Sequence, residues 1–545
     1  MLKQLKKMLK KIIPFFLSLA MLLSLCGCRM DTKSIIWGIE EKEVSFTYDK
    51  NVYLATEKIR NLNPLISKDE SVYYISKLVF DSIFRLDEKL IPQPLLAESY
   101  TYSEDGTELT VHLKKNVQFH DGHALTGEDV KFTIEAIKAL AKTGETLYSS
   151  HVASIKSVIY SDSNPFDVII KYSSGYGNGY ENLIFPILPA HQFKSVNAIK
   201  SASYKMIGTG PYKQSDYLEL TSLILTPYNE YFGSKAESTL HFQIVPNISY
   251  ATGMADSGDV SLFFDDTVNK DSILSKYELG VTTYISNKPD VLGFNCTGPL
   301  FSKVEARQAI AYLVDASEIL EKAYYKNGVL SDSLFYPDYY GVGNEGDKYP
   351  VDPAAAAKLL KKAGLKDTDG DGTLNFGEGE NATLNLIYQS SDSFREKAAS
   401  IIAGELKAAG IAVNVIPCSD ASYYERLSLK DYDLFIGGFE IDERYDLRSI
   451  LGSAYGNAAG YSNEEVDALL SDLICGIKQY GKSTNVKKLK KIICEELPYY
   501  TLLYRADACY LSPYFDGLAT PVFNDIYRGC KSWQCKYPES FTEEE

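Results

Sequence analysis

The most regular set of potential ligand residues is an acidic loop in the second half of the chain. Oxygen-bearing side chains recur there at the offsets of an EF-hand loop, with a glycine at the sixth position. Such a spacing can wrap a calcium ion, whose role would be structural rather than catalytic. The alternative is a turn-rich connection between a helix and a strand, because no flanking pair of EF-hand helices is evident. The candidate ligands are Asp367, Asp369, Asp371, Thr373, Asn375 and Glu378.

No other arrangement of residues points to catalysis or to a cofactor. His120 and His123 are three residues apart, but the first belongs to a predicted turn, so we do not expect a metal pair. Gly175, Gly177 and Gly179 lack the spacing of a phosphate-binding loop. The Gly-x-Ser-x-Gly motif is absent and the histidines are scattered, so no nucleophile and base stand out. We therefore expect a protein that is not an enzyme and requires no cofactor.

The N-terminus has the layout of a bacterial targeting segment. The first eleven residues hold five lysines and no acid, and a mostly apolar run follows that is too short to span a bilayer comfortably. The run ends in Leu25-Cys26-Gly27-Cys28, where a small residue precedes the second cysteine, as in the lipobox of lipoproteins. We predict a signal peptide over residues 1–27, a diacylated Cys28 and a tether over 28–45. The alternative is a cleaved secretory signal without lipid, and Cys26 fits badly because a leucine precedes it.

Composition and charge narrow the class of protein. The 545 residues are 45% hydrophobic and 23% charged, which is an ordinary globular composition. The 72 acidic residues outnumber the 56 basic ones, and such a surface repels phosphate backbones, so we expect no nucleic-acid binding. No long apolar run follows the N-terminus, which excludes a multi-span membrane protein. Removal of the lysine-rich segment makes the chain still more acidic, so lipid rather than charge would hold it to an anionic membrane.

The cysteines do not form a disulfide framework. Once residues 1–27 are removed, seven of the nine cysteines remain besides Cys28, scattered through a chain that is large enough to build its own core. Cys530 and Cys535 are close enough in sequence to pair, and we leave this question open. The other cysteines are interpreted as small buried hydrophobic residues.

Helices alternate with short apolar strands along the chain, which indicates an α/β architecture. The clearest helix is expected over Gly127–Lys142, because Thr126 can cap it and two acids occupy its first turn. Further helices are expected over Lys303–Lys322, Pro353–Ala363, Ser391–Ala409 and Asn463–Tyr480, and strands over Val44–Tyr48, Leu109–Leu113, Asp290–Asn295, Thr383–Tyr388, Val413–Ile416 and Tyr432–Ile436.

A series of short motifs in a fixed order resembles the family 5 extracellular solute-binding proteins, the oligopeptide- and dipeptide-binding subunits of ABC importers. The most specific stretch is Phe119-His120-Asp121-Gly122, followed by Leu125–Val130. Each motif alone is weak, but their order extends from about Leu62 to Gly517. The other motifs are Leu62–Pro64, Pro94–Ser99, Ser103–Gly106, Gly208–Tyr212, Gly293–Asn295, Arg307–Ile310, Asp352-Pro353, Asn457 and Gly460–Asn463.

The resemblance implies a two-lobed, periplasmic-binding-protein-like (type II) α/β fold with an extra inserted domain. A discontinuous base lobe is expected over 46–75, 203–288 and 505–540, the inserted domain over 76–202 and the opposing lobe over 289–504. Chain crossings near Lys288 and Tyr504 would form a hinge. A ligand that contacts both lobes would shift such a protein toward a closed state.

The strongest ligand candidates follow a predicted buried strand, Leu434–Ile436, and would face the cleft. The resemblance implies that an aromatic residue stands three before an aspartate there. The backbone would pair with an extended peptide, and the aspartate would neutralise the α-ammonium. Two departures are a phenylalanine in place of the usual tryptophan, and Asp446-Leu447 where Asp-Pro is common. The alternative for Asp442 is an ordinary surface acid. The candidates are Phe439, Glu440, Ile441 and Asp442.

The strand opposite is expected from the base lobe, where Lys68–Ser71 matches in position. Its candidate ligand residues are Asp69, Glu70 and Ser71, and the alternative is a polar loop. With several acids opposite, the cleft would be acidic, which favours peptides with basic groups or cationic solutes.

Together these features predict a lipid-anchored receptor on the extracytoplasmic face of the cell membrane, on a Gram-positive surface. It would capture oligopeptides as a monomer and deliver them to an ABC permease, while other chains supply the permease and the ATPase. One alternative is a surface peptide sensor without transport. Others are a receptor for nickel, haem or sugar, since fold does not fix ligand, and a secreted hydrolase, against which the missing nucleophile motifs argue.

Overall fold

The computed structural model describes residues 45–175, 179–200, 204–266, 270–344, 346, 348–376, 380–475 and 481–539. The predicted signal peptide, Cys28, most of the tether and Glu378 lie outside these ranges. The chain divides into a large unit, Tyr48–Lys536, and a terminal unit whose described residues are 45–47 and 537–539.

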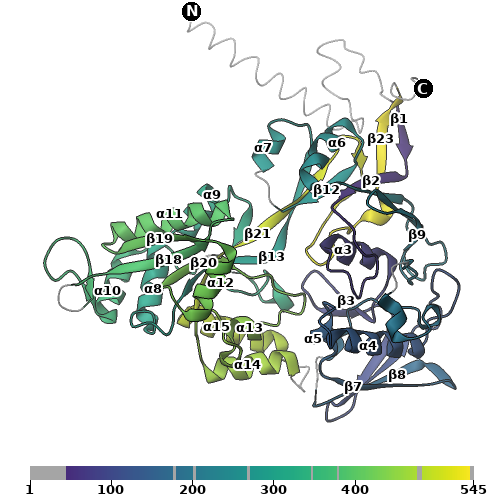
Figure 1. Ribbon diagram of the computed structural model, residues 1–545, viewed down its shortest axis with the longest axis horizontal. Coiled ribbons are helices and arrows are strands. Elements are labelled where there is room, and N and C mark those ends of the chain that lie inside the picture. Colours follow the sequence, from purple (N-terminus) through teal and green to yellow (C-terminus); the bar gives the residue numbers. More distant parts are fainter. Residues whose placement is uncertain are drawn as a thin grey trace, which may run out of the picture. The chain divides into compact units, whose positions relative to one another are not determined.

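A single mixed sheet organises the large unit (Figure 1). Within the described residues it has eleven strands, in the order β19-β18-β20-β13-β21-β12-β2-β11-β10-β9, with β14 pairing with β21. Its centre is formed by two long strands, β13 (Gly280–Phe294) and β21 (Tyr499–Leu511), which run antiparallel from the pair Gly280–Leu511 to the pair Gly293–Tyr499. These two strands therefore connect the two flanking groups of strands.

On one flank, short parallel strands pack under helices. The strands are β18 (Thr383–Gln389), β19 (Ala412–Cys418) and β20 (Leu434–Gly438), with β18 parallel to both others. Helices α8 (Val304–Leu313) and α11 (Ser393–Ala408) share a buried apolar core with them. Strands covered by helices in this way become nearly continuous hydrophobic runs, as the buried Leu434–Ile436 illustrates.

On the other flank, strands β12 (Leu262–Asp265), β2 (Asn51–Thr56), β11 (Thr239–Ile244), β10 (Ser222–Pro227) and β9 (Tyr212–Leu218) continue the sheet. A separate four-stranded sheet, β5-β6-β8-β7, lies between residues 97 and 172. One apolar core joins this four-stranded sheet to strand β2 and its neighbours in the large sheet, because Val52, Leu109 and Trp533 belong to the same cluster of buried residues.

The predicted helix near Gly127 is confirmed as α4 (Gly127–Ala141). The Thr126 backbone N–H donates to the Asp129 carboxylate at 2.9 Å, which satisfies one donor at the helix start. The other carboxylate oxygen of Asp129 accepts from the Ala190 backbone N–H at 2.8 Å and so ties the helix to the following segment.

Two structural predictions are wrong. The helix expected over Lys303–Lys322 is two helices, α8 and α9 (Ala316–Lys322), because Asp315 takes an extended conformation and caps α9 by accepting from the Glu318 N–H at 2.9 Å. The strand expected over Lys68–Ser71 is the start of a helix, α3 (Glu70–Val79), whose N-cap position is Asp69.

The remaining predicted elements lie close to their expected places where the structure describes them; residues 476–480 of the helix expected over Asn463–Tyr480 and Val44 of the first expected strand lie outside the described residues. Cys530 and Cys535 are buried free thiols rather than a disulfide. In the described part of the chain, no helix combines the length and the apolar character needed to cross a membrane. The other elements are β1 (Phe46–Asp49), β3 (Phe84–Leu86), β4 (Pro92–Pro94), β5 (Ala97–Tyr102), β6 (Glu108–Leu113), α5 (Ser149–Val152), β7 (Ile155–Ser161), β8 (Asn164–Tyr172), η1 (Gly179–Asn182), η2 (Ala190–Gln192), η3 (Val196–Lys200), η4 (Ile248–Tyr250), α6 (Ala251–Ser257), α7 (Lys270–Leu274), β14 (Gly328–Leu330), η5 (Tyr339–Gly341), α10 (Pro353–Ala363), β15 (Leu365–Lys366), β16 (Asn375–Phe376), β17 (Glu380–Asn381), α12 (Asp420–Leu429), α13 (Arg448–Leu451), η6 (Ser453–Tyr455), α14 (Glu464–Cys475), α15 (Lys482–Glu496), β22 (Phe515–Asp516), η7 (Cys530–Ser532) and β23 (Gln534–Pro538).

Candidate functional site

A cavity of about 530 Å³ opens where β2, β12, β13 and β21 meet the start of α3, and we call it the large cavity. This volume falls in the usual range for ligand pockets. Charged, hydroxyl, amide and aromatic groups line it together. Its lining includes Glu57, Lys58, Arg60, Lys68, Asp69, Glu70, Ser71, Tyr74, Asn247, Ser249, Phe264, Asp266, Tyr284, Lys288, Asp507 and Tyr527.

All three base-lobe candidates line the large cavity, although they do so from a helix start and not from a strand. Asp69 is engaged by the protein, since its carboxylate accepts from the backbone N–H of Arg60 at 2.8 Å and from the Arg60 guanidinium at 3.2 Å. Glu70 stands in the first turn of α3, and Ser71 follows it. Both are therefore held in place by the helix.

Glu70 and Asp507 are the cavity's carboxylates with the most perturbed surroundings. Solvent reaches Glu70, but the protein around it displaces part of its water, and this desolvation raises the pKa of its carboxyl group. Desolvation also raises the pKa of Asp507 to about 7, helped by Asp266 and Glu70 and opposed by Lys288 and Arg505. The protein thus makes the ionised form of both groups costly.

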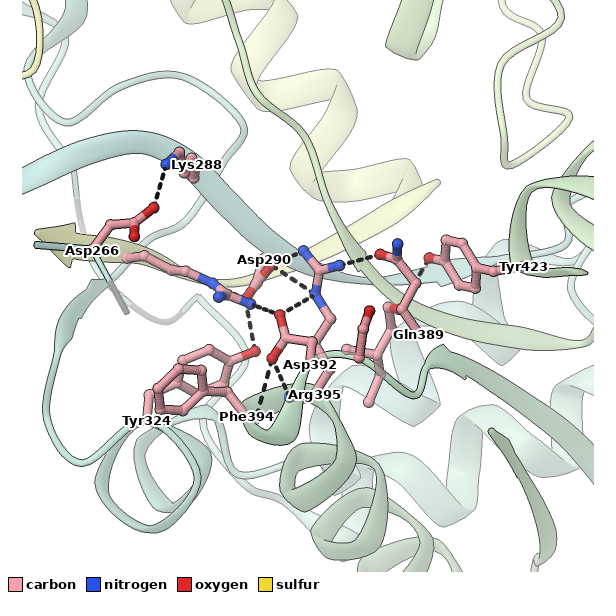
Figure 2. A network of polar contacts seen from close by, with 12 residues as sticks. Asp266, Lys288, Asp290, Tyr324, Gln389, Asp392, Phe394, Arg395 and Tyr423 are labelled. Atoms are coloured by element: carbon pink, nitrogen blue, oxygen red, sulfur yellow. Dashed lines mark hydrogen bonds and ion pairs between the residues drawn. The ribbon is translucent and has the colours of Figure 1, made fainter. Parts of the chain in front are cut away.

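The charge of Lys288 acts on both of these acids, and Lys288 is already paired. Its ammonium lies 2.9 Å from a carboxylate oxygen of Asp266. Burial works to lower the pKa of Lys288, but Asp266 and Asp507 raise it overall, so the side chain is charged. Figure 2 shows this pair beside the polar network described next.

A second charged group lies between strands β13 and β21 and the start of helix α11, and we call it the arginine network (Figure 2). Asp290 of β13 is buried and accepts from Arg395 at 2.8 Å, from Arg505 of β21 at 2.6 Å and from the Tyr324 hydroxyl at 2.7 Å. Arg505 also donates to Asp392 at 2.6 Å. Burial alone would raise the pKa of Asp290, but the two guanidinium groups hold it below its usual range.

The opposing candidates, Phe439 to Asp442, are not among the residues that line the large cavity. The backbone N–H groups of Phe439 and Ile441 donate to the carbonyls of Pro289 and Asn287, each at 3.2 Å. The protein's own strand β13 thus uses two of the donors that a peptide would need. Glu440 is exposed and lies within electrostatic reach of Glu70.

Asp442 is paired with Arg444, whose guanidinium approaches its carboxylate to 2.6 Å. The Arg444 side chain is 5% exposed and also donates to Asn182 at 2.9 Å and to Ser150 at 2.6 Å. The Asp442 side chain remains 43% exposed, so a ligand could still reach it. An ammonium bound there would share the carboxylate with a guanidinium.

Two other ion pairs join parts of the unit that are distant in sequence. Glu443 pairs with Lys77 of α3 and accepts from the Tyr73 hydroxyl. Glu181 forms a buried pair with Lys482 at the start of α15. These contacts link the predicted opposing lobe to the predicted base lobe and inserted domain.

The acidic loop between β15 and β16 brings three predicted calcium ligands together. The carboxylates of Asp367, Asp369 and Asp371 lie within 4.8 Å of one another on the surface. The Asn375 side chain is used differently, because its oxygen accepts from the backbone N–H and the hydroxyl of Thr368, each at 2.8 Å. Thr373 donates its N–H to Asp371 at 2.6 Å.

The two histidines singled out in the sequence separate in the structure. His120 bonds to the backbone of Gly208 and Gly210, which fixes a turn. His123 stacks on His191, and both imidazoles contact the Asp121 carboxylate. His191 is 68 positions away from His123 in sequence, so the pairing carried no local signal.

Sequence reasoning missed Asp507 and the aromatic part of the cavity. One signal was available, because Arg505 and Asp507 are two residues apart in an otherwise apolar strand. Side chains at that spacing point to one side of a strand, and charged groups in a buried strand need partners or a function.

Three features agree with a solute-binding protein. They are the order of the sequence motifs, the mixed sheet with a group of strands on each side of β13 and β21, and the cavity beside these two strands. The chain matches the bacterial extracellular solute-binding proteins, family 5, over residues 92–461, and it belongs to that family. Its fold is therefore the two-lobed α/β fold of periplasmic binding proteins, as the resemblance implied.

Individual relatives bind different ligands. The oligopeptide-binding protein AppA of Bacillus subtilis is 26% identical over 492 residues, which cover 87% of this chain and 89% of that one. Heme-binding protein A of Haemophilus influenzae is 24% identical over 474 residues, covering 80% and 83%. The solved structure of AppA in complex with a nonapeptide has a TM-score of 0.62 and 23% identity, and the match covers 90% of this chain and 99% of that one.

Proposed function

We propose that this protein is the lipid-anchored substrate-binding subunit of an ABC importer that captures oligopeptides and delivers them to a permease. The observation that carries the proposal is the large cavity, in which polar and aromatic groups meet beside the strands that join the two flanks of the sheet. A peptide needs such a mixture, because its backbone is polar and its side chains vary. The similarity to an oligopeptide-binding protein over 87% of the chain supports the same ligand class.

The peptide would lie between Asp69, Glu70 and Ser71 on one side and Phe439 to Asp442 on the other. Glu440 supports this arrangement, because its charge acts on Glu70. Asp442 is the candidate partner of the peptide α-ammonium, since its carboxylate is partly exposed.

The most direct test is mass spectrometry of the ligand released from the purified protein. We expect a mixture of peptides, and their binding should be reproduced by calorimetry with synthetic peptides of the same sequences. A single non-peptide solute would replace the peptide assignment. Haem is the specific rival, because a haem-binding relative covers 80% of this chain, and it would be recognised by its visible absorption.

The anchor is proposed at Cys28, where two acyl chains would suffice for stable attachment. In the intact cell, Cys28→Ser should release the protein from the membrane fraction or leave the precursor unprocessed. Cys26→Ser is the matched control and should change neither. Loss of the lipid in Cys26→Ser, with retention in Cys28→Ser, would move the anchor to the other cysteine.

Transport is distinguished from sensing by uptake. Deletion of the gene should abolish uptake of a labelled peptide that the purified protein binds, and the wild-type gene should restore it. Normal uptake in the deletion strain would favour a surface sensor.

A further inference from the structure

Two carboxylates of the large cavity, Glu70 and Asp507, form no ion pair with the described residues. The side chains of Glu70 and Asp507 both line it, one from the first turn of α3 and the other from β21. Neither side chain makes a hydrogen bond or an ion pair with any residue in the described ranges. The two groups are near enough that the charge of Glu70 acts on Asp507.

The cations around Asp507 are committed elsewhere. The ammonium of Lys288 lies 2.9 Å from the carboxylate of Asp266, so the charges of these two residues neutralise each other within the cavity. Arg505, two residues before Asp507 on the same strand, directs its guanidinium to Asp290 and Asp392, each at 2.6 Å. Glu70 and Asp507 therefore remain in this part of the cavity as carboxyl groups without an ion-pair partner among the described residues.

Aromatic rings complete this part of the cavity. Four of them line it: Tyr74, Phe264, Tyr284 and Tyr527. The centroid of the Phe264 ring lies 6.4 Å from that of Tyr284 and 5.6 Å from that of Tyr527. The Tyr74 hydroxyl donates to the Phe523 carbonyl at 3.0 Å, which fixes its ring. Aromatic faces attract cations, and carboxylates neutralise them, so the two kinds of group act in the same direction on a positively charged ligand.

We propose that Glu70 and Asp507, with these aromatic walls, form a subsite for the cationic end of a basic peptide side chain. The subsite would select peptides that carry lysine or arginine over peptides of the same size without a positive charge. The proposal rests on peptide capture as the function and adds a substrate class to it. It is separate from the candidate α-ammonium position at Asp442.

A pair of peptide series tests the subsite. One series is a set of alanine-based hexapeptides with a single lysine at each position in turn, and the other has norleucine in its place, which keeps the hydrocarbon chain and removes the ammonium group. We expect at least one lysine position to bind about tenfold more tightly than its norleucine counterpart in calorimetry, as for one desolvated charge contact.

The variants Glu70→Gln and Asp507→Asn should each reduce this preference, and together they should bring it below about threefold. They should leave the affinity for norleucine peptides nearly unchanged. Asp216→Asn is the control, because it removes an exposed acid from β9 outside the cavity. It should keep the full lysine preference.

Equal binding of lysine and norleucine peptides at every position would overturn the subsite while leaving peptide capture intact. A lysine preference that survives the double substitution would overturn it as well. If no hexapeptide binds, the proposed function fails, and cadaverine then tests the subsite alone. Its binding to the wild type and loss in Asp507→Asn would support the subsite, and no binding would reject it.

Discussion

Strands β13 and β21 contribute residues to two charged groups that are built in opposite ways. In the arginine network, the carboxylates of Asp290 and Asp392 face the guanidinium groups of Arg395 and Arg505, and each charge is hydrogen-bonded. In the large cavity, Asp507 follows Arg505 by two residues and has no cation of its own among the described residues. The charges of the first group are paired within the protein, whereas the second group is where we propose that a cationic ligand binds.

The difference shows how a strand can serve stability and binding at adjacent positions. A buried charge is tolerated when its partners are fixed, which makes the arginine network part of the structure. A carboxylate that remains without a partner reduces stability, and proteins keep such residues where binding needs them. The carboxyl groups of Glu70 and Asp507 in the large cavity therefore lower the stability of the folded chain.

The largest expected effect comes from breaking the arginine network. Asp290→Ala leaves Arg395 and Arg505 without their shared carboxylate, and removing one partner of a buried pair costs roughly 3–5 kcal/mol. We expect a loss of this size in the free energy of unfolding measured with urea. Asp392→Ala, whose side chain is 18% exposed, should cost less. Equal and small losses in both variants would show that the network is not a structural element.

A second prediction concerns Asp442, whose carboxylate is paired yet partly exposed. Asp442→Asn should weaken the binding of peptides with a free amino terminus by about 2 kcal/mol, the low end for one partner of a buried charge pair, because Arg444 already shares the carboxylate. N-acetylated peptides should bind weakly to the wild type, and the substitution should cost them little. Calorimetry on the four combinations measures this coupling. Equal losses for free and acetylated peptides would assign Asp442 to holding Arg444 in place.

The sequence predicted the local elements of the fold better than the contacts between distant residues. The parallel strands and their helices were predicted because hydrophobic periodicity is local, and β18, β19 and α10 lie at or near their expected bounds. The helix start at Glu70 was missed, because matching by position carried an expected strand onto a segment whose own cap, Asp69, favours a helix.

The long-range parts of the site were beyond local patterns. The arginine network joins residues more than a hundred positions apart, such as Asp290 with Arg395 and Arg505. Glu70 and Asp507 meet across 437 positions, which only the assembled sheet can bring about. Sequence reasoning placed Glu70 at the cleft through resemblance, and it had no means of finding the second carboxylate.

A third prediction extends the comparison to the acidic loop, where carboxylates gather without a cation but on the surface. The backbone N–H groups of Gly370 and Gly372 donate to Asp367 and lower its pKa, so this acid is already stabilised in its ionised form. If calcium binds, a concentration about tenfold above its dissociation constant should add about 1.4 kcal/mol to the free energy of unfolding.

Calorimetric melting in chelated and calcium-containing buffer measures this effect. Asp369→Ala combined with Asp371→Ala should abolish the calcium response while leaving the chelated sample nearly unchanged. An unchanged melting temperature in the wild type would leave the loop as a turn that needs no ion.

The smallest expected effect is the gain in stability when the unpaired acid of the cavity is made neutral. The pKa of Asp507 is raised to about 7 by desolvation, with Asp266 and Glu70 adding to the shift and Lys288 and Arg505 opposing it. The folded chain therefore holds a proton on Asp507 that the unfolded chain has already released above about pH 4.

The sign of the pH dependence follows from this difference. The favourable contribution of protonated Asp507 is fully present below about pH 4 and is lost as the pH rises through about 7. Asp507→Asn should therefore be more stable than the wild type at pH 8, by about 1 kcal/mol after allowance for the solvent in the open cavity, and nearly equal to it at pH 4. Glu405, whose pKa is also raised to about 7, gives the wild type a similar slope, so the difference between variant and wild type is the quantity to measure. A variant that is less stable than the wild type at pH 8 would mean that Asp507 has a partner in the folded protein, and the contrast with the arginine network would then fail.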